Sequence, residues 1–323
     1  MMWMDMHCDT ISRLLELEQK GKPEGLRQNS GHLDLMKMKK GRYQAQNFAL
    51  FVDMGETEDP MKKAMELLDL FYRELDANQD WIAPARSVSE MEENERQGRL
   101  SAFLTVEEGG VCKGSLAALR NFYRLGVRMM TLTWNYENEL GYPHTMSESP
   151  GTGLKQTGIE FVEEMERIGM IIDVSHLSDQ GFYDVAAHTR KPFAASHSNA
   201  RALCPHSRNL TDDMLRILGE RGGVAGINFA TNFLDPLAVR GRSVSRISDM
   251  TAHMRHIADV AGIEAVGLGT DYDGIGGSVE IRDASEMPLL EEGMKKAGFS
   301  SSEIDKICFG NVKRLYREIL REN

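Results

Sequence analysis

Residues 170–197, MIIDVSHLSDQGFYDVAAHTRKPFAASH, hold two short apolar runs on either side of a longer polar segment. The runs Met170–His176 and Pro192–His197 have the length of strands, and each ends in a histidine. The segment Ser178–His188 between them opens with a serine that can cap a helix. Two strand-length apolar runs joined by a helix predict a βαβ unit with parallel strands.

The same alternation continues in both directions from this unit. Further strands are expected at Met2–Asp9, Gln46–Asp53, Ser101–Glu107, Arg128–Trp134, Gly223–Phe229 and Ala265–Asp271. Further helices are expected at Met61–Asn78, Ser115–Leu125, Gly158–Ile168, Thr211–Arg221 and Ser248–Val260, and a helix pair over Ser300–Glu322 is expected to close the fold. Eight strands alternating with helices, without a G-x-G-x-x-G turn after the first strand, predict an α/β fold of the (β/α)8 TIM barrel type.

The composition is that of a globular protein, and the length together with the composition permits one domain or two. Of the 323 residues, 41% are hydrophobic and 27% are charged, and the chain has no low-complexity segment, fixed repeat or Pro/Ser-rich linker. We therefore expect a single barrel domain over residues 1–323.

The net charge and the N-terminal sequence limit the kinds of partner and the cellular compartment that we expect for this protein. A net charge of −11 disfavours nucleic acid and anionic lipid as partners. The N-terminal residues lack the pattern of a secretory signal, and no stretch approaches the roughly 18 apolar residues of a membrane span. Four scattered cysteines without a C-x-x-C pair fit a reducing compartment. We therefore expect a soluble, cytoplasmic protein with no nucleic-acid or membrane partner.

Candidate metal ligands fall at the C-terminal ends of the expected strands, the face on which barrel enzymes carry their active sites. His7 and Asp9 end the first strand, and their spacing of two directs both side chains to one face. Glu107 ends the third strand, and His176 and His197 end the fifth and sixth. Five such ligands are too many for one tetrahedral zinc and suit two, which typically share a bridging hydroxide as nucleophile.

Two further polar residues are candidates for roles in chemistry. Asp271, in GLGTDYDG, ends the last expected strand, where a carboxylate can hold the bridging water and pass its proton to a leaving amine. A turn-capping role is the alternative, and it suits Asp273 better because that residue precedes a glycine. Arg208 follows the sixth strand and can clamp a substrate carboxylate, although a surface arginine is the default interpretation from sequence alone.

The chain resembles the membrane dipeptidase (renal dipeptidase) family of binuclear zinc peptidases. Matching stretches include HCDT (7–10), FLTVEEGG (103–110), IIDVSH (171–176), SHSNAR (196–201), SRNLTDD (207–213) and GLGTDYDG (267–274), which occur in family order across most of the chain. The resemblance implies a (β/α)8 barrel, usually homodimeric, that hydrolyses dipeptides and tolerates a C-terminal D-residue.

The resemblance also implies roles for the site residues. Two Zn²⁺ ions would be bound by His7 and Asp9 and by His176 and His197, a glutamate would bridge them, Asp271 would be the general acid/base, and Arg208 would hold the dipeptide's C-terminal carboxylate. The family has one glutamate before Gly-Gly, whereas this chain has Glu107 and Glu108. An ungapped alignment through the following helix selects Glu107 as the bridging ligand.

Two positions depart from the family pattern. Mammalian members carry a histidine after the fourth strand, where this chain has Trp134, and an indole cannot polarise a carbonyl as an imidazole does. Asn135 or His144 is a candidate for the missing contact. Ala230 replaces a tyrosine near the end of the seventh strand. We therefore expect intact metal chemistry and an altered choice of dipeptide.

Two other classes of function stay open at this point. One is a binuclear-metal amidase, lactonase or phosphoesterase that acts on a small substrate without a free dipeptide carboxylate. The other is a barrel that binds metal without turnover, which the complete ligand set together with Asp271 disfavours. The remaining histidines are expected to be structural or surface groups, and they are His32, His188, His206, His253 and His256.

Overall fold

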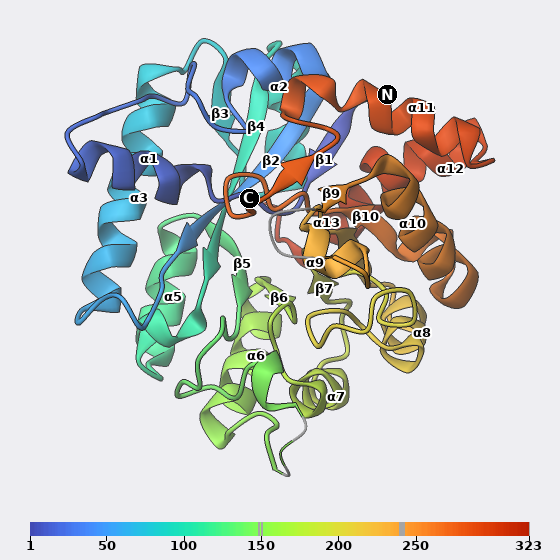
Figure 1. The fold of residues 1–323 in the computed structure, drawn as a ribbon. Coiled ribbons are helices and arrows are strands. Elements are labelled where there is room, and N and C mark those ends of the chain that lie inside the picture. The colour runs from blue at the N-terminus through green and yellow to red at the C-terminus, as the bar shows by residue number, and fades with distance from the viewer. Residues whose placement is uncertain (148, 150, 239–242, 323) are drawn as a thin grey trace.

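Eight parallel strands form a closed barrel with helices around it (Figure 1). The structure is a computed structural model that describes residues 1–147, 149, 151–238 and 243–322. The barrel strands are β1 (Trp3–Asp5), β2 (Tyr43–Phe51), β4 (Leu100–Glu107), β5 (Val127–Thr131), β6 (Ile171–Asp173), β7 (Ala194–Ala195), β8 (Val224–Ile227) and β10 (Val266–Leu268). They run in the order β2-β1-β10-β8-β7-β6-β5-β4, and pairing of β4 with β2 closes the ring. The (β/α)8 prediction is confirmed.

The helices follow the expected pattern in six of the predicted places. The larger helices are α1 (Thr10–Gln19), α2 (Leu35–Gly41), α3 (Pro60–Ala77), α4 (Val88–Arg96), α5 (Leu116–Arg124), α6 (Gln156–Ile168), α7 (Asp179–His188), α8 (Asp212–Glu220), α10 (Ile247–Ala261), α11 (Pro288–Lys296) and α13 (Asn311–Ile319). Ser115, Ser178 and Thr211 cap α5, α7 and α8 by accepting a backbone N–H three residues on. The predictions missed α1, α2, α4 and α11.

The C-terminal helix pair is the prediction that the structure contradicts. Residues 301–319 form one helical run in which α12 (Ser301–Asp305) passes through a π-helical turn at Lys306–Gly310 into α13. Gly310 keeps α-helical dihedral angles, with φ −60° and ψ −42°, so it does not break the helix. Ile307 and Cys308 are fully buried in this turn, and their burial favours an uninterrupted path.

Except for β4, which ends at Glu107 as expected, the barrel strands end earlier than the sequence suggested. β1 ends at Asp5, β6 at Asp173 and β10 at Leu268, so the polar residues that follow lie in loops. His176 and Asp271 adopt left-handed backbone conformations, with φ of 67° and 61°, which a continuing strand does not allow. A short strand, β3 (Ile82–Pro84), was also not expected, and it pairs in parallel with the start of β4.

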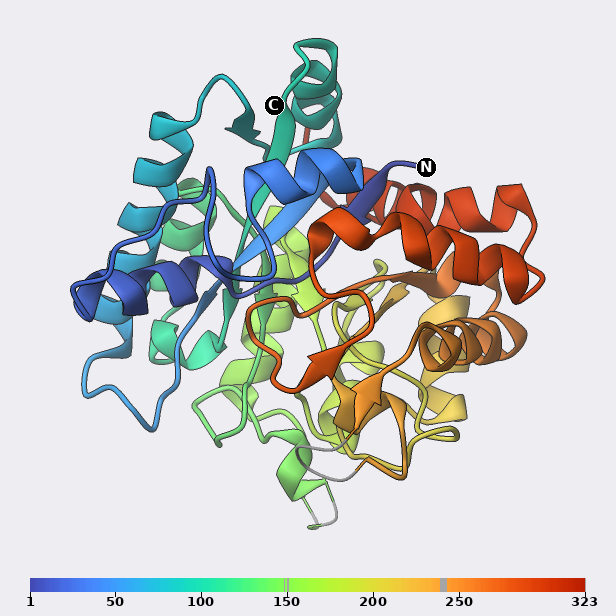
Figure 2. The ribbon, with the colours of Figure 1, turned by 45° about the horizontal axis from the view of Figure 1, so that its top comes forward.

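The two ends of the barrel differ in what closes them. Met4, Phe103, Met129 and Ile171 fill the interior and pack with Val312, Leu315, Tyr316 and Ile319 of α13, which closes the N-terminal end. At the other end, β9 (Val244–Ser245) and β11 (Ser278–Val279) form a small sheet beside the mouth (Figure 2). Among the described residues, no helix is both long and apolar enough to cross a bilayer.

Candidate metal centre

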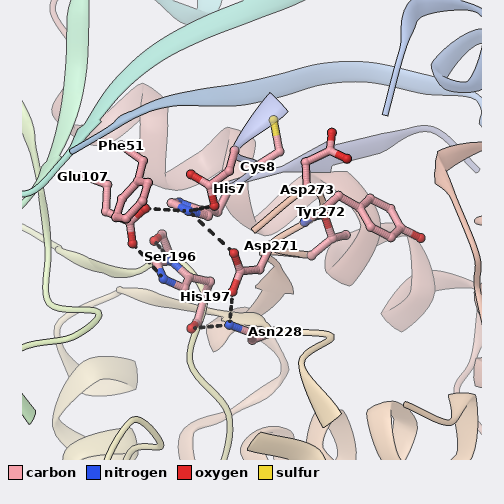
Figure 3. Close-up of polar contacts among 12 residues, drawn as sticks. His7, Cys8, Phe51, Glu107, Ser196, His197, Asn228, Asp271, Tyr272 and Asp273 are labelled. Atoms are coloured by element: carbon pink, nitrogen blue, oxygen red, sulfur yellow. Dashed lines mark hydrogen bonds and ion pairs between the residues drawn. The ribbon is translucent and has the colours of Figure 1, made fainter. Parts of the chain in front are cut away.

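The five predicted ligands come together at the C-terminal mouth of the barrel, and all are buried. Glu107 lies between the others: its Oε2 is 3.2 Å from Nε2 of His7 (Figure 3), and its Oε1 is 3.0 Å from Nε2 of His176. Nε2 of His197 is 3.6 Å from the same Oε1, and Oδ2 of Asp9 is 3.6 Å from Nε2 of His7. One carboxylate therefore faces two pairs of ligands, one through each oxygen.

The two histidines that follow β6 and β7 present bare nitrogens to each other. The Ser196 hydroxyl donates its hydrogen bond to Oδ2 of Asp173 at 2.5 Å. The Ser196 oxygen therefore accepts a hydrogen bond from Nδ1 of His197, at 2.7 Å. Nδ1 of His176 donates to Oδ1 of Asn135 at 3.1 Å. Burial lowers the pKa of both histidines well below the usual value, so the rings are neutral. Their Nε2 atoms, each carrying a lone pair, lie 2.9 Å apart, an arrangement that is repulsive unless a cation is shared.

The other side of the site is crowded with carboxylates. Nε2 of His7 and Oδ1 of Asp9 are buried and have no hydrogen-bond partner among the described residues. Burial and the charge of Glu107 raise the pKa of Asp9. Atoms of His7, Asp9 and Asp271 lie within 4.8 Å of one another, as do atoms of His7, Glu107 and His197. Imidazole nitrogens and carboxylate oxygens are ligands that Zn²⁺ accepts, so these residues fit a divalent metal.

Glu108 is turned away from this cluster. Its backbone has φ of 96°, and its carboxylate accepts the backbone N–H of Gly110 at 2.7 Å and of Trp134 at 2.9 Å. A third contact comes from the side-chain amide of Asn138. Burial raises the pKa of Glu108 to about 7. Of the two adjacent glutamates, Glu107 is the one that faces the histidines, and Glu108 holds the loop that carries Trp134.

Two buried aspartates that were not predicted as site residues, Asp173 and Asp5, form hydrogen bonds to the residues next to the site. Asp173 binds Ser196, the partner of the His197 ring, and also accepts the backbone N–H of Ser196 at 2.8 Å. Asp5 at the end of β1 has the same relation to the loop after the neighbouring strand β10, because it accepts both the hydroxyl and the N–H of Thr270. The sequence feature that could have identified them is an aspartate inside an apolar run, as in IIDVS (171–175). A carboxylate buried in such a run requires hydrogen-bond donors around it.

Asp271 is held at the mouth by its backbone and by one amide. Asn228 donates from Nδ2 to Oδ2 of Asp271 at 2.8 Å, while Oδ1 lies 3.9 Å from Nε2 of His7 (Figure 3). Burial raises the pKa of Asp271 to about 7, the charges of Asp9 and Glu107 add to the rise, and His7 opposes it. This carboxyl is thus placed to hold or release a proton near neutral pH.

The hydrogen bonds of Asp273 are structural, as expected from its place in a turn. It has φ of 69°, accepts the Thr10 hydroxyl at 2.7 Å and accepts the backbone N–H of His32 at 2.7 Å. These contacts fasten the start of α1 to the loop after β10. His253 is likewise structural, because its ring accepts from the backbone N–H of Ala200 and contacts the carbonyl of Leu234.

Arg208 is buried, so its default interpretation as a surface arginine is wrong. It lines a cavity of about 640 Å³ together with Glu107, His176 and Asp271. Nη1 and Nη2 make long contacts, 3.3 Å to Ser198 and 3.4 Å to the carbonyl of His197, and Nε has no partner among the described residues. A guanidinium held so loosely beside a cavity is free to bind an anionic ligand.

The two departures from the expected pattern also border this cavity. Trp134 and Ala230 both line it, as does Asn135. The Trp134 ring packs edge-on against Phe51, with ring centroids 4.9 Å apart. Ala230 leaves open the space that a larger side chain would take. His144 is buried next to this wall, where its Nε2 lies 3.1 Å from Oδ1 of Asn135.

Comparison with known proteins decides the family. A family model for membrane dipeptidase (peptidase family M19) matches residues 1–322. The chain belongs to the membrane dipeptidase family. Dipeptidase aclJ of Aspergillus oryzae is 31% identical over 299 residues, which cover 90% of this chain and 70% of that protein. The protein is therefore a hydrolase of peptide bonds, and the metallopeptidase family implies a metal cofactor.

Solved structures of the membrane dipeptidase family superpose closely on this chain. The crystal structure of dipeptidase AC, an M19 metallopeptidase, has a TM-score of 0.91 at 29% identity and covers 98% of both chains. A metallopeptidase from Rhodobacter sphaeroides, liganded with a phosphinate mimic of the dipeptide L-Ala-D-Ala, has a TM-score of 0.90 at 28% identity and covers 98% of this chain and 99% of its own.

Proposed function

We propose that this protein hydrolyses dipeptides, including those with a C-terminal D-residue, at two Zn²⁺ ions. One ion would be held by His7 and Asp9 and the other by His176 and His197, and Glu107 would be a ligand to both. The observation that carries the proposal is the position of Glu107, whose two oxygens face His7 at 3.2 Å and His176 at 3.0 Å. When bound, such a metal pair polarises the peptide carbonyl and supplies a nucleophilic hydroxide at neutral pH.

Asp271 moves the proton in this proposal. Its Oδ2 is fixed by Asn228, so Oδ1 is the oxygen that is directed toward His7 and Asp9. A carboxylate in that place accepts a proton from the attacking water and returns it to the departing amine. The Asp271 side chain is 14% exposed and lines the cavity, so it is accessible to a bound substrate.

Arg208 binds the C-terminal carboxylate of the dipeptide. Its unpartnered Nε and its two long contacts leave donors for a bidentate pair with a carboxylate. The pocket between Arg208 and Ala230 accommodates the C-terminal side chain. The ligand of the Rhodobacter sphaeroides relative, a mimic of L-Ala-D-Ala, supports a D-residue in that position.

We also propose a homodimer that works in the cytoplasm. The four cysteines are free and buried, which suits a reducing compartment. Sedimentation of the purified protein measures the assembly, and fractionation of cells measures the location.

The test combines metal analysis with a screen of L,L- and L,D-dipeptides on one preparation. We expect two zinc ions per chain, and we expect His176→Ala and Asp271→Ala to abolish hydrolysis. Full dipeptidase activity in metal-free protein would overturn the mechanism. An Arg208→Ala enzyme with unchanged KM would favour an amidase, lactonase or phosphoesterase substrate instead, because the carboxylate clamp would then be idle.

A further inference from the structure

Asn135 lies in the loop after β5, on the cavity wall beside Trp134 and His176. Its Oδ1 is 3.1 Å from Nδ1 of His176 and 3.1 Å from Nε2 of His144. One amide oxygen therefore meets two imidazole rings from different parts of the chain.

The orientation of this amide follows from the two rings. His176 faces Glu107 and His197 with Nε2, so its hydrogen is on Nδ1 and needs an acceptor. An amide oxygen accepts and an amide nitrogen does not, so the atom facing the rings is Oδ1. His144 then donates from Nε2 to the same oxygen, and its Nδ1 is complemented by the Ser207 hydroxyl at 2.7 Å.

His144 fixes this arrangement at two points. Besides the ring contact to Asn135, its backbone N–H donates to the carbonyl of His176 at 2.7 Å. The hydroxyl of Ser207, next to Arg208, holds the other edge of the His144 ring. The Asn135 amide is thus tied both to a candidate metal ligand and to the loop that carries the candidate carboxylate clamp.

The consequence concerns the amide nitrogen. With Oδ1 held by two rings, Nδ2 is directed away from both, and no oxygen among the described residues accepts a hydrogen bond from it. Asn135 lines the same cavity as Glu107, His176 and Arg208. We propose that Nδ2 of Asn135 donates a hydrogen bond to an oxygen of the bound dipeptide, which makes Asn135 a catalytic residue and His144 its positioning residue. This inference rests on the proposed dipeptidase reaction.

Two oxygens of a dipeptide fit this donor, and they give different kinetics. A bond to the carbonyl of the scissile peptide strengthens as negative charge develops, so its loss lowers kcat. A bond to the terminal carboxylate, shared with Arg208, is made equally in the ground state, so its loss raises KM. Either pattern identifies a donor to substrate.

The decisive variant is Asn135→Asp. A carboxylate at this position still accepts from both imidazoles, so His176 keeps its orientation, and only the donor is lost. We expect kcat/KM for the best dipeptide to fall about 100-fold, the usual cost of one such donor. Zinc content and Tm should stay at wild-type values. Affinity for a phosphinate dipeptide mimic, measured by calorimetry, should fall with kcat/KM.

Asn232→Asp is the control for a charge added to the cavity, because Asn232 lines the same cavity and is not among the side-chain hydrogen-bond partners of His144 or His176 in the described residues. The loss in Asn135→Asp must exceed the loss in this control by at least tenfold. If Asn135 served only to orient His176, Asn135→Asp would match the control, and that result would overturn the inference while leaving the dipeptidase reaction intact. A wild-type protein that hydrolyses no dipeptide would instead overturn the proposed function itself.

Discussion

Gly274 allows one added methyl group to test the metal centre. A Cβ at this position would lie 2.0 Å from Oδ2 of Asp9 and 2.6 Å from Oδ1 of Asp271. Both atoms belong to side chains, and the φ angle of Gly274 is outside the left-handed region, so the backbone of Gly274→Ala is not strained. The methyl group therefore competes with two carboxylates and leaves the rest of the fold alone.

The size of the effect follows from the distances. Ordinary contact with a Cβ begins at 3.4 Å, so Oδ2 of Asp9 has to move by about 1.4 Å from its place at 2.0 Å. A misplacement of about 1 Å in a catalytic group costs on the order of 100-fold in rate, equivalent to about 2.7 kcal/mol. Crowding of this kind destabilises a fold by about 1–3 kcal/mol, so the protein should remain folded.

The assay measures zinc content, kcat/KM for a dipeptide and Tm on the same preparation of Gly274→Ala. We expect substoichiometric zinc and at least a 100-fold loss of kcat/KM. Gly276→Ala is the matched control for zinc content, because its Cβ would meet no atom within 4 Å. A Gly274→Ala protein with full zinc and full activity would show that Asp9 and Asp271 do not act where we place them.

Four other perturbations have defined outcomes. Ser196→Ala removes the oxygen that accepts the hydrogen bond from the His197 ring, and it should weaken zinc binding about 10–100-fold, measured in competition with a chelator. An unchanged zinc affinity would show that Ser196 does not support His197 as a ligand. Chelation of the metal should lower Tm and added zinc should restore it, since ligand binding to the folded state stabilises it by mass action, and a Tm indifferent to metal would count against the site. Gly269→Ala should yield little soluble protein, because its Cβ would lie 1.8 Å from a backbone oxygen of Ser196, which has no room to move, and normal yield would contradict that. The hydrogen bond from Arg167 lowers the pKa of Glu164 to about 2, so Glu164→Gln should be less stable than the wild type at pH 7. In urea titrations this difference in the free energy of unfolding should decrease as the pH falls from about 4.5 to about 2. A difference that does not change with pH would exclude the ion pair as its source.

The barrel and the meeting of the candidate ligands could be predicted because parallel strands bring their C-terminal ends to one face. That rule places His7 and His197 near each other although they are 190 positions apart in the sequence. It does not say where a strand stops. The left-handed turns at His176 and Asp271 end the strands earlier than apolar runs suggest, and only pairing with neighbours decides that.

The supporting residues could not be predicted from one sequence. Asn228 and Asp173 act through hydrogen bonds to residues on other strands, and such pairings leave no local pattern. The burial of Arg208 has the same origin, because the loops that cover it come from distant segments. The continuous helical path through Gly310 was not predicted, because the buried π-helical turn that carries it depends on contacts with the barrel and leaves no local pattern.

The helix that plugs the base of the barrel also orders the events of biosynthesis. β1 has to wait for β10 to emerge before its second edge is paired, and α13 emerges later still. During translation the first 250 residues therefore present an open sheet with an uncovered lower face, a species that is prone to aggregate. The five proposed ligands, from His7 to His197, all precede β8, so they emerge before the last strands and the helix that close the barrel around them. We expect these ligands to bind metal firmly only once β10 has paired with β1, so bound metal would report that the barrel has closed.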